Sequence, residues 1–179
     1  ELWAYLEEYE AMMGGEALAI PHNGNLSSGV MFALEDAKGN PLSKGYAKSR
    51  SRWEPLYEVT QMKGDSESHR LLSPTDEFSD YETWTQDIPY YYVKEVVEKR
   101  GYRDYESWVN KHSQAKDANW MRTYEYGRSA LKLGLAQQAK LGVNPFKFGM
   151  IGSTDAHTSL AAVDENNFGG KTAGDEPSK

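Results

Sequence analysis

The sequence predicts an α/β protein with parallel strands, and three observations support this class. Three short apolar runs, at residues 17–20, 56–62 and 146–151, have the length and bounding residues of buried strands. Stretches with helical spacing of apolar residues precede the first and third runs. Polar residues follow each run directly. Helices and strands that follow one another in this way are typical of α/β folds.

The helices are predicted from spacing and from glycines at their ends. Apolar residues recur at helical spacing over 2–13, and the following Gly14-Gly15 pair predicts a left-handed C-cap. A second helix is predicted over 122–141, before Gly142. We expect a short helix at 76–84 and mostly loop at 23–52, with at most one helical turn near 28–34.

Composition limits the classes of function. The 179 residues suit one globular unit, and a formal net charge of -7 disfavours nucleic acid and anionic membranes as partners. The chain has no cysteine, so a metal can be held only by His, Asp, Glu or water. It shows no secretory signal and no apolar stretch that could span a membrane. We therefore expect a soluble protein, with cytoplasm and periplasm both open.

Potential metal ligands stand where the predicted strands end. His22 follows the first strand, and Asp155 and His157 follow the third. The carboxyl ends of parallel strands share one edge of a sheet, where ligands and catalytic groups gather. Imidazole and carboxylate suit Zn, Mn or Fe, and two or three such ions can activate water for hydrolysis. The alternatives are a hydrogen-bonded turn at Asp155-Ala-His157 and a loop-capping His22.

Other polar residues near these strands are candidates for catalysis or substrate binding. Glu58 and His69 are the candidate catalytic residues, with a solvent-facing or salt-bridged Glu58 and a solvated turn at His69 as the alternatives. Arg52, Lys63 and Asn23 are candidates for binding an anionic substrate, because guanidinium groups match phosphate oxygens.

Four runs carry a resemblance to a known family. They are Ile20-Pro-His-Asn-Gly-Asn-Leu-Ser, the run from Arg52 to His69, Leu72-Ser-Pro-Thr-Asp-Glu-Phe, and the run from Asn144 to His157. Together they resemble the DUF3604 family, whose members look like PHP-domain (polymerase and histidinol phosphatase) metallohydrolases. The resemblance implies a distorted (β/α)7 barrel with a multinuclear metal centre at the strand ends, hydrolysing phosphoesters.

The resemblance also assigns residues. Asp155 and His157 match the closing Asp-x-His metal motif, and His22 matches a metal histidine in the middle of the barrel. Glu58, Gln61 and His69 lie in family motifs and are expected to line the site. The opening His-x-His motif and the next Asp-His and Glu positions of the family have no match here. Residues 1–171 therefore resemble the carboxyl-terminal part of a PHP-like barrel that is incomplete in this chain, with an aromatic-rich insert at 84–120. Residues 172–179 are expected to be a disordered tail.

The predicted function is metal-dependent hydrolysis of an anionic ester, most simply a phosphoester. Hydrolysis of another ester or an amide by the same centre is one alternative. A non-catalytic module that binds a sugar or protein through the aromatic segment 84–126 is another. Half a barrel exposes sheet edges, so we expect the chain alone to self-associate, or to need its missing half, and to bind metal weakly.

Overall fold

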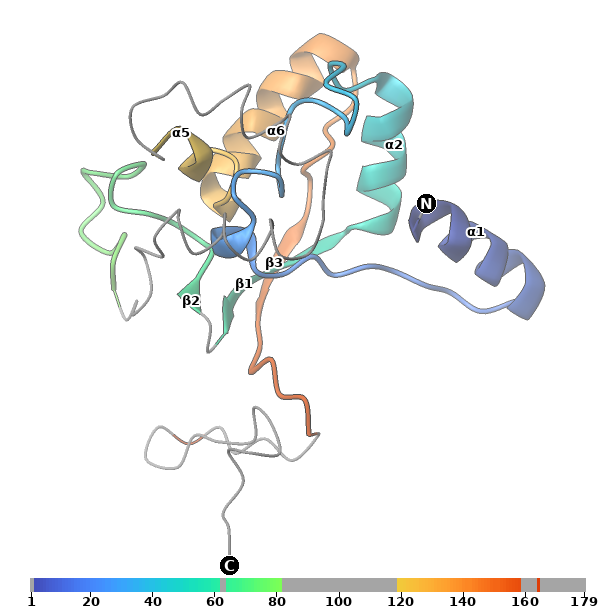
Figure 1. Ribbon diagram of the computed structural model, residues 1–179, viewed down its shortest axis with the longest axis horizontal. Coiled ribbons are helices and arrows are strands. Elements are labelled where there is room, and N and C mark those ends of the chain that lie inside the picture. The colour runs from blue at the N-terminus through green and yellow to red at the C-terminus, as the bar shows by residue number, and fades with distance from the viewer. Residues whose placement is uncertain (1, 62–63, 82–118, 159–163, 165–179) are drawn as a thin grey trace, which may run out of the picture.

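The computed structural model describes residues 2–61, 64–81, 119–158 and 164 (Figure 1). Almost all of the predicted insert at 84–120 and the whole of the predicted tail lie outside these residues. The elements in chain order are α1 (Leu2–Met13), the 3-10 helix η1 (Gly24–Leu26), α2 (Lys44–Trp53), β1 (Leu56–Gln61), β2 (Gly64–Asp65), α5 (Asn119–Arg122), α6 (Gly127–Leu141) and β3 (Gly149–Gly152). In this part of the chain, no helix is long and apolar enough to cross a membrane.

The strands form a small mixed sheet in the order β2-β1-β3. β1 and β3 are parallel, with Leu56 opposite Gly149 and Glu58 opposite Ile151. This confirms the α/β class and the parallel pairing of the second and third predicted strands, although β3 begins later than predicted. β2 was not predicted and pairs with β1 in the antiparallel direction. A closed barrel is not part of the described structure.

The first predicted strand, at 17–20, is not a regular strand, but its chain runs beside β1. The Ala19 N–H donates to the Trp53 carbonyl (2.7 Å), and the Glu58 N–H donates to the Pro21 carbonyl (3.0 Å). The Pro55 carbonyl accepts from Gly149 of β3, so alternation along β1 directs the Glu58 N–H to the opposite edge. The segment therefore lies parallel to β1, on the edge away from β3, and Pro21 has no N–H with which to extend a ladder.

Two helices differ from the prediction. Residues 44–52 were predicted as loop but belong to α2, whose start is capped by the Ser43 hydroxyl accepting from the Tyr46 N–H (3.1 Å). Its buried side chains are Ala47, Arg50 and Trp53, and the charged Arg50 among them leaves little apolar periodicity to recognise in the sequence. The helix predicted at 76–84 is wrong over its described part, where residues 76–81 form turns.

Both predicted glycine C-caps are confirmed, at Gly14 (φ 66°) after α1 and at Gly142 (φ 75°) after α6. The start of α6 is five residues later than predicted. Its first two N–H groups, at Gly127 and Arg128, donate to the carbonyls of Ser66 (2.8 Å) and Glu67 (2.9 Å). The loop after β2 thus satisfies helix-terminal donors that have no partner within the helix.

The core lies between β1 and α6. It contains Phe32, Leu42, Tyr57, Val59, Ala130 and Phe146. Phe32 makes edge-to-face contacts with Tyr57 and Phe146, at centroid distances of 4.9 and 5.3 Å. Since side chains alternate along a strand, Tyr57 and Val59 face this core and Glu58 faces the other side of the sheet.

Gly24 occupies a position where no side chain fits. A Cβ at Gly24 meets the Tyr57 hydroxyl and the backbone carbonyl of Glu125. We expect Gly24→Ala to lower the free energy of unfolding by about 1–3 kcal/mol, because backbone must move to accept the methyl group. Urea denaturation measures the change.

Gly45 provides the matched control. A Cβ there meets only the Ser43 hydroxyl at an ordinary 3.7 Å, and the residue lies within α2. Gly45→Ala is expected to stabilise the protein by roughly 0.5–1 kcal/mol, because alanine favours the helix. Equal effects of the two substitutions would contradict the close approach at Gly24.

Candidate strand-end site

The segment with His22 and Asn23 is fixed to β1 at two points. The carbonyl of Pro21 accepts from the Glu58 N–H, and the side chain of Asn23 accepts from the Gln61 side-chain amide through Oδ1. Asn23 has a left-handed backbone (φ 59°), which asparagine tolerates better than most residues. His22 lies between these two anchors and is solvent-exposed. It is therefore held at the edge of β1, between the bonds that join Pro21 to Glu58 and Asn23 to Gln61.

Glu58 is the buried carboxylate of this edge. Its side chain is 9% exposed, and its Oε1 finds no hydrogen-bond donor among the described residues. The Glu58 N–H donates to the carbonyl of Pro21, the residue before His22. The backbones of the exposed His22 and the buried Glu58 therefore lie close together at this edge.

Asp155 and His157 come together after β3. Asp155 Oδ1 and His157 Nε2 are 3.3 Å apart. The chain leaves the sheet through a bond from the Ser153 N–H to the Thr60 carbonyl (3.0 Å), and Figure 1 shows it running away from the helices beyond this point. Asp155 has a left-handed backbone (φ 54°), and the Thr154 hydroxyl accepts from the Ala156 N–H (3.2 Å). A strained carboxylate at a strand end is a frequent feature of functional sites.

The three predicted metal ligands do not form one group. The described residues contain no cluster of three or more His, Asp or Glu side chains arranged to hold a metal ion. His22 stands on one edge of β1, and β3 pairs with the other. Two strand spacings, about 10 Å, therefore separate the backbone of His22 from that of β3. The structure pairs Asp155 with His157 and places His22 across β1 from them.

His69, a candidate catalytic residue, is fully buried. Its Nδ1 accepts from the Leu71 N–H (3.1 Å), and its Nε2 lies 2.8 Å from Arg122 Nη1. Each of these two donors needs a lone pair on the ring nitrogen that it faces. A neutral imidazole has a lone pair on one nitrogen only, so one tautomer satisfies the Leu71 N–H and the other satisfies Arg122. The ring also packs against Tyr126 at a centroid distance of 5.2 Å. The catalytic role remains a prediction, and the contacts give His69 a structural role in joining its turn to α5.

The candidate substrate-binding residues are separated in space. Arg52 lies at the end of α2, before the amino end of β1, whereas Asn23 is bound to Gln61 at the other end. The Arg52 guanidinium pairs with Glu10 of α1 (2.8 Å) and stacks over Trp53, 4.4 Å from its ring centre. Lys63 lies outside the described residues. The structure therefore places only Asn23 at the strand ends.

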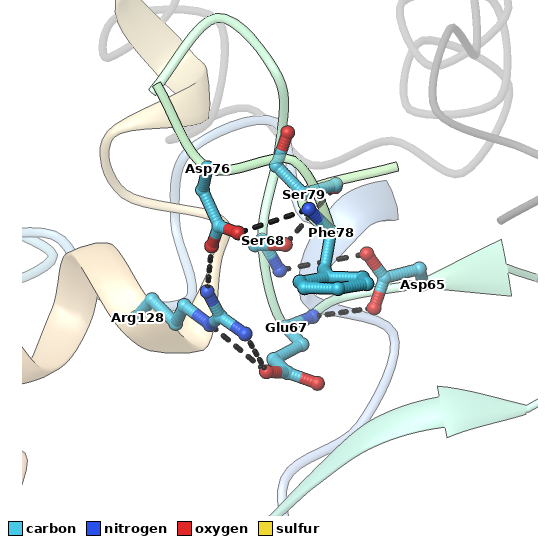
Figure 2. A network of polar contacts seen from close by, with 7 residues as sticks. All are labelled: Asp65, Glu67, Ser68, Asp76, Phe78, Ser79 and Arg128. Carbon is cyan, nitrogen blue, oxygen red and sulfur yellow. Dashed lines mark hydrogen bonds and ion pairs between the residues drawn. The ribbon is translucent and has the colours of Figure 1, made fainter. Parts of the chain in front are cut away.

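A polar network ties α6 to the loop after β2 (Figure 2). Arg128 binds Glu67 (2.7 Å) and Asp76, and Asp65 accepts from the Glu67 N–H (2.8 Å). Burial raises the pKa of Asp65, whereas the Phe78 N–H and then Arg128 lower the pKa of Asp76. All three acidic side chains are used in shaping this loop. The network is a structural support beside the strand ends.

Glu125 is a buried carboxylate that the sequence reasoning missed. It is 6% exposed and accepts from the Gly29 N–H (3.1 Å), where Ser28 and Gly29 both have left-handed backbones. Burial raises the pKa of Glu125 to about 7, against the opposing effects of the Gly29 bond and the Arg122 charge. Nothing in its sequence surroundings, in a stretch expected to be an ordinary helix, signalled a buried acid.

These features define a mixed α/β protein with imidazole and carboxylate groups at the carboxyl ends of neighbouring parallel segments. The model of the family described as "Protein of unknown function (DUF3604)" matches residues 1–179. The chain therefore belongs to the DUF3604 family, as the four sequence runs indicated. No curated protein and no solved structure matched the chain.

Proposed function

We propose that this chain forms one side of a metal-dependent hydrolase site of PHP type, which acts on an anionic ester such as a phosphoester. The observation that carries the proposal is the contact of Asp155 with His157 where β3 ends, beside the parallel β1. A PHP-type barrel, of which the described sheet would be a part, is the fold that we propose for the complete unit. In such folds the strand ends hold the reactive groups.

The residues present fit a metal ion in part. The carboxylate of Asp155 and the imidazole of His157 are ligand types that suit Zn, Mn or Fe, and they already lie together. His22 would supply a further ligand from across β1, but the described residues do not gather three ligands at one point. A bound divalent ion would lower the pKa of a water molecule and supply a hydroxide nucleophile at neutral pH.

The remaining roles follow from position. Asn23, fixed by Gln61, would orient the substrate at the same edge as His22. Arg52 has no part in the proposed site, because it pairs with Glu10 at the opposite end of β1.

Substitutions at Asp155 test the proposal in the natural full-length protein. Asp155→Asn keeps a residue that tolerates the left-handed backbone but removes the charge, and Asp155→Ala removes both. We expect both variants to lose metal and turnover, measured by elemental analysis and by hydrolysis of phosphomonoesters, phosphodiesters, carboxylic esters and amides. Asp36→Asn, in an exposed turn, is the control and is expected to keep both.

The substrate panel also separates the alternatives. Turnover of a carboxylic ester or amide alone would replace the phosphoester by another substrate of the same centre. A metal-free protein whose ligand binding survives Asp155→Ala and His157→Ala would overturn the enzyme proposal in favour of a binding module.

A further inference from the structure

The turn at residues 27–30 lies between two fixed points of the chain. Before it, the Asn25 N–H donates to the Ser66 hydroxyl (3.1 Å), which anchors the chain to the loop after β2. After it, the Phe32 N–H donates to the Tyr124 carbonyl (3.0 Å), and the Phe32 ring lies in the core. The turn has no ionisable side chain of its own. Any charge that holds this turn in place must therefore come from outside it.

Glu125 holds the backbone of this turn. Ser28 and Gly29 both have left-handed backbones (φ 54° and 75°), which for serine is a strained conformation that needs support. The Gly29 N–H donates to Glu125 Oε1 (3.1 Å), and the Ser28 N–H binds the same carboxylate. Successive backbone N–H groups of a turn form a hollow that binds an anion, and here the anion is a side chain of the protein itself. The contact is enclosed, because Glu125 is 6% exposed and Ser28 is 1% exposed.

Two effects act against each other on the Glu125 carboxyl group. The two backbone N–H groups favour the ionised form, but burial disfavours it more strongly and raises the pKa of Glu125 to about 7. In an open turn the carboxylate meets water, and its pKa returns toward the ordinary value of 4.5. The closed turn therefore holds the proton more tightly than the open turn, so loss of the proton favours opening.

The nearest ionisable neighbours of Glu125 keep their charge states near neutral pH. Arg122 of α5 lowers the pKa of Glu125, and its guanidinium stays charged. Tyr57 of β1 and Tyr126 of α6 interact with the carboxylate, and burial raises the pKa of both phenols, so both stay neutral. Among these four groups, only Glu125 changes its charge near pH 7.

Two further ionisable side chains interact with these phenols. His69 packs against Tyr126, and the charge of Asp65 in β2 acts on both Tyr57 and Tyr126. Burial also raises the pKa of Asp65, but its oxygens accept from N–H groups of its own turn. Asp65 is therefore a matched control for Glu125, because it is a buried acid that acts on the same phenols and binds a different turn.

We propose that Glu125 is a proton-controlled latch: while its carboxyl group is protonated the turn at 27–30 stays closed, and loss of the proton favours opening of this turn between its anchors at Asn25 and Phe32. Opening uncovers the Glu125 carboxylate and the Ser28 hydroxyl, which in the closed turn is buried without a hydrogen-bond partner among the described residues. The inference concerns the turn alone and does not depend on the proposed hydrolase activity.

Hydrogen exchange with residue resolution in the natural full-length protein tests the latch. The protection of each amide is expressed relative to the unfolded peptide at the same pH. With a pKa of about 7 in the closed turn and 4.5 in the open one, protection at Gly29 is expected to fall about 10–100-fold from about pH 5 to about pH 8. Low urea concentrations should not change this protection, because opening of a short turn exposes little surface. Protection at Phe32 is expected to stay higher and to depend on urea.

Three variants make the result specific, with circular dichroism to confirm folding. Glu125→Gln keeps an uncharged oxygen that can accept from Gly29, so protection at Gly29 is expected to be the same at both pH values. Glu125→Ala removes the acceptor, and we expect low protection at Gly29 at both pH values. Asp65→Asn is the control and should retain the fall seen in the wild type.

The outcomes are distinct. A fall at Gly29 in the wild type and in Asp65→Asn, but not in Glu125→Gln, supports the latch. Constant protection in the wild type, or a fall of wild-type size in Glu125→Gln, would overturn it. A fall that depends on urea as strongly as exchange at Phe32 would overturn it as well, because a larger unit would then open. If Glu125→Ala does not fold, the comparison of the wild type with Glu125→Gln decides by itself.

Discussion

Replacing Arg50 by alanine is expected to lower the free energy of unfolding by about 3–5 kcal/mol, the range for breaking a buried ion pair from one side. Arg50 is 6% exposed, and its Nε binds Glu54 (2.9 Å) while Nη2 donates to the Met31 carbonyl (2.8 Å). Its guanidinium also lies 4.8 Å from the ring centre of Phe146. Alanine leaves the Met31 carbonyl and the Glu54 carboxylate without this partner and opens a cavity beside the core.

Arg52 gives a matched control on the same helix. It also forms an ion pair, with Glu10, but its side chain is 54% exposed. Exposed pairs contribute about 0–1 kcal/mol, so Arg52→Ala should change stability within that range. Chemical denaturation of both variants gives the comparison. Similar losses for the two would show that burial is not what makes Arg50 important.

Replacing Glu125 by glutamine is expected to stabilise the protein at alkaline pH and to have little effect near pH 5. The pKa of Glu125 is about 7 in the folded protein and near 4.5 in the unfolded chain. The folded state holds the proton more tightly, so stability is greatest below pH 4.5 and falls as pH rises through 7. The full difference corresponds to about 3 kcal/mol. Glutamine is uncharged at every pH in this range, so the variant does not lose this stability as pH rises.

Stability measured against pH checks this result. The difference between Glu125→Gln and wild type should grow as pH rises from about 5 to about 8. Asp36→Asn is the control with the opposite pH dependence. Hydrogen bonds from Asn40 lower the pKa of Asp36, so the contribution of Asp36 to folding stability is lost as pH falls. A difference for Glu125 that stays flat, or favours wild type at high pH, would contradict the buried-acid assignment.

The parts of the fold that were predictable are those with local signals. Gly14 and Gly142 mark helix ends by their own backbone freedom, and the apolar run at 56–62 defines β1. α2 was missed because its buried face includes Arg50, whose burial depends on Glu54 and on the distant Met31. The late start of α6 was missed because its partners, Ser66 and Glu67, are some 60 residues away.

The candidate site could likewise be predicted only in part: the sequence indicates candidate residues, but not how they lie relative to one another. His22, Asp155 and His157 were predicted at strand ends; Asp155 and His157 do follow β3, whereas His22 follows a segment that is not a regular strand. Their separation across β1 depends on strand order, which no single run encodes. Glu125 was not predicted at all, since its burial comes from packing against the Ser28–Gly29 turn.

The start of α6 has a consequence for how this chain assembles. The N–H groups of its first two residues donate to the carbonyls of Ser66 and Glu67, which are some 60 residues away in the sequence and must first be brought close. The helix can elongate from its middle, but its first turn gains these bonds only when the two regions dock. Slow hydrogen exchange at Gly127 and Arg128 therefore reports long-range docking, whereas exchange at Gln137 reports local helix formation.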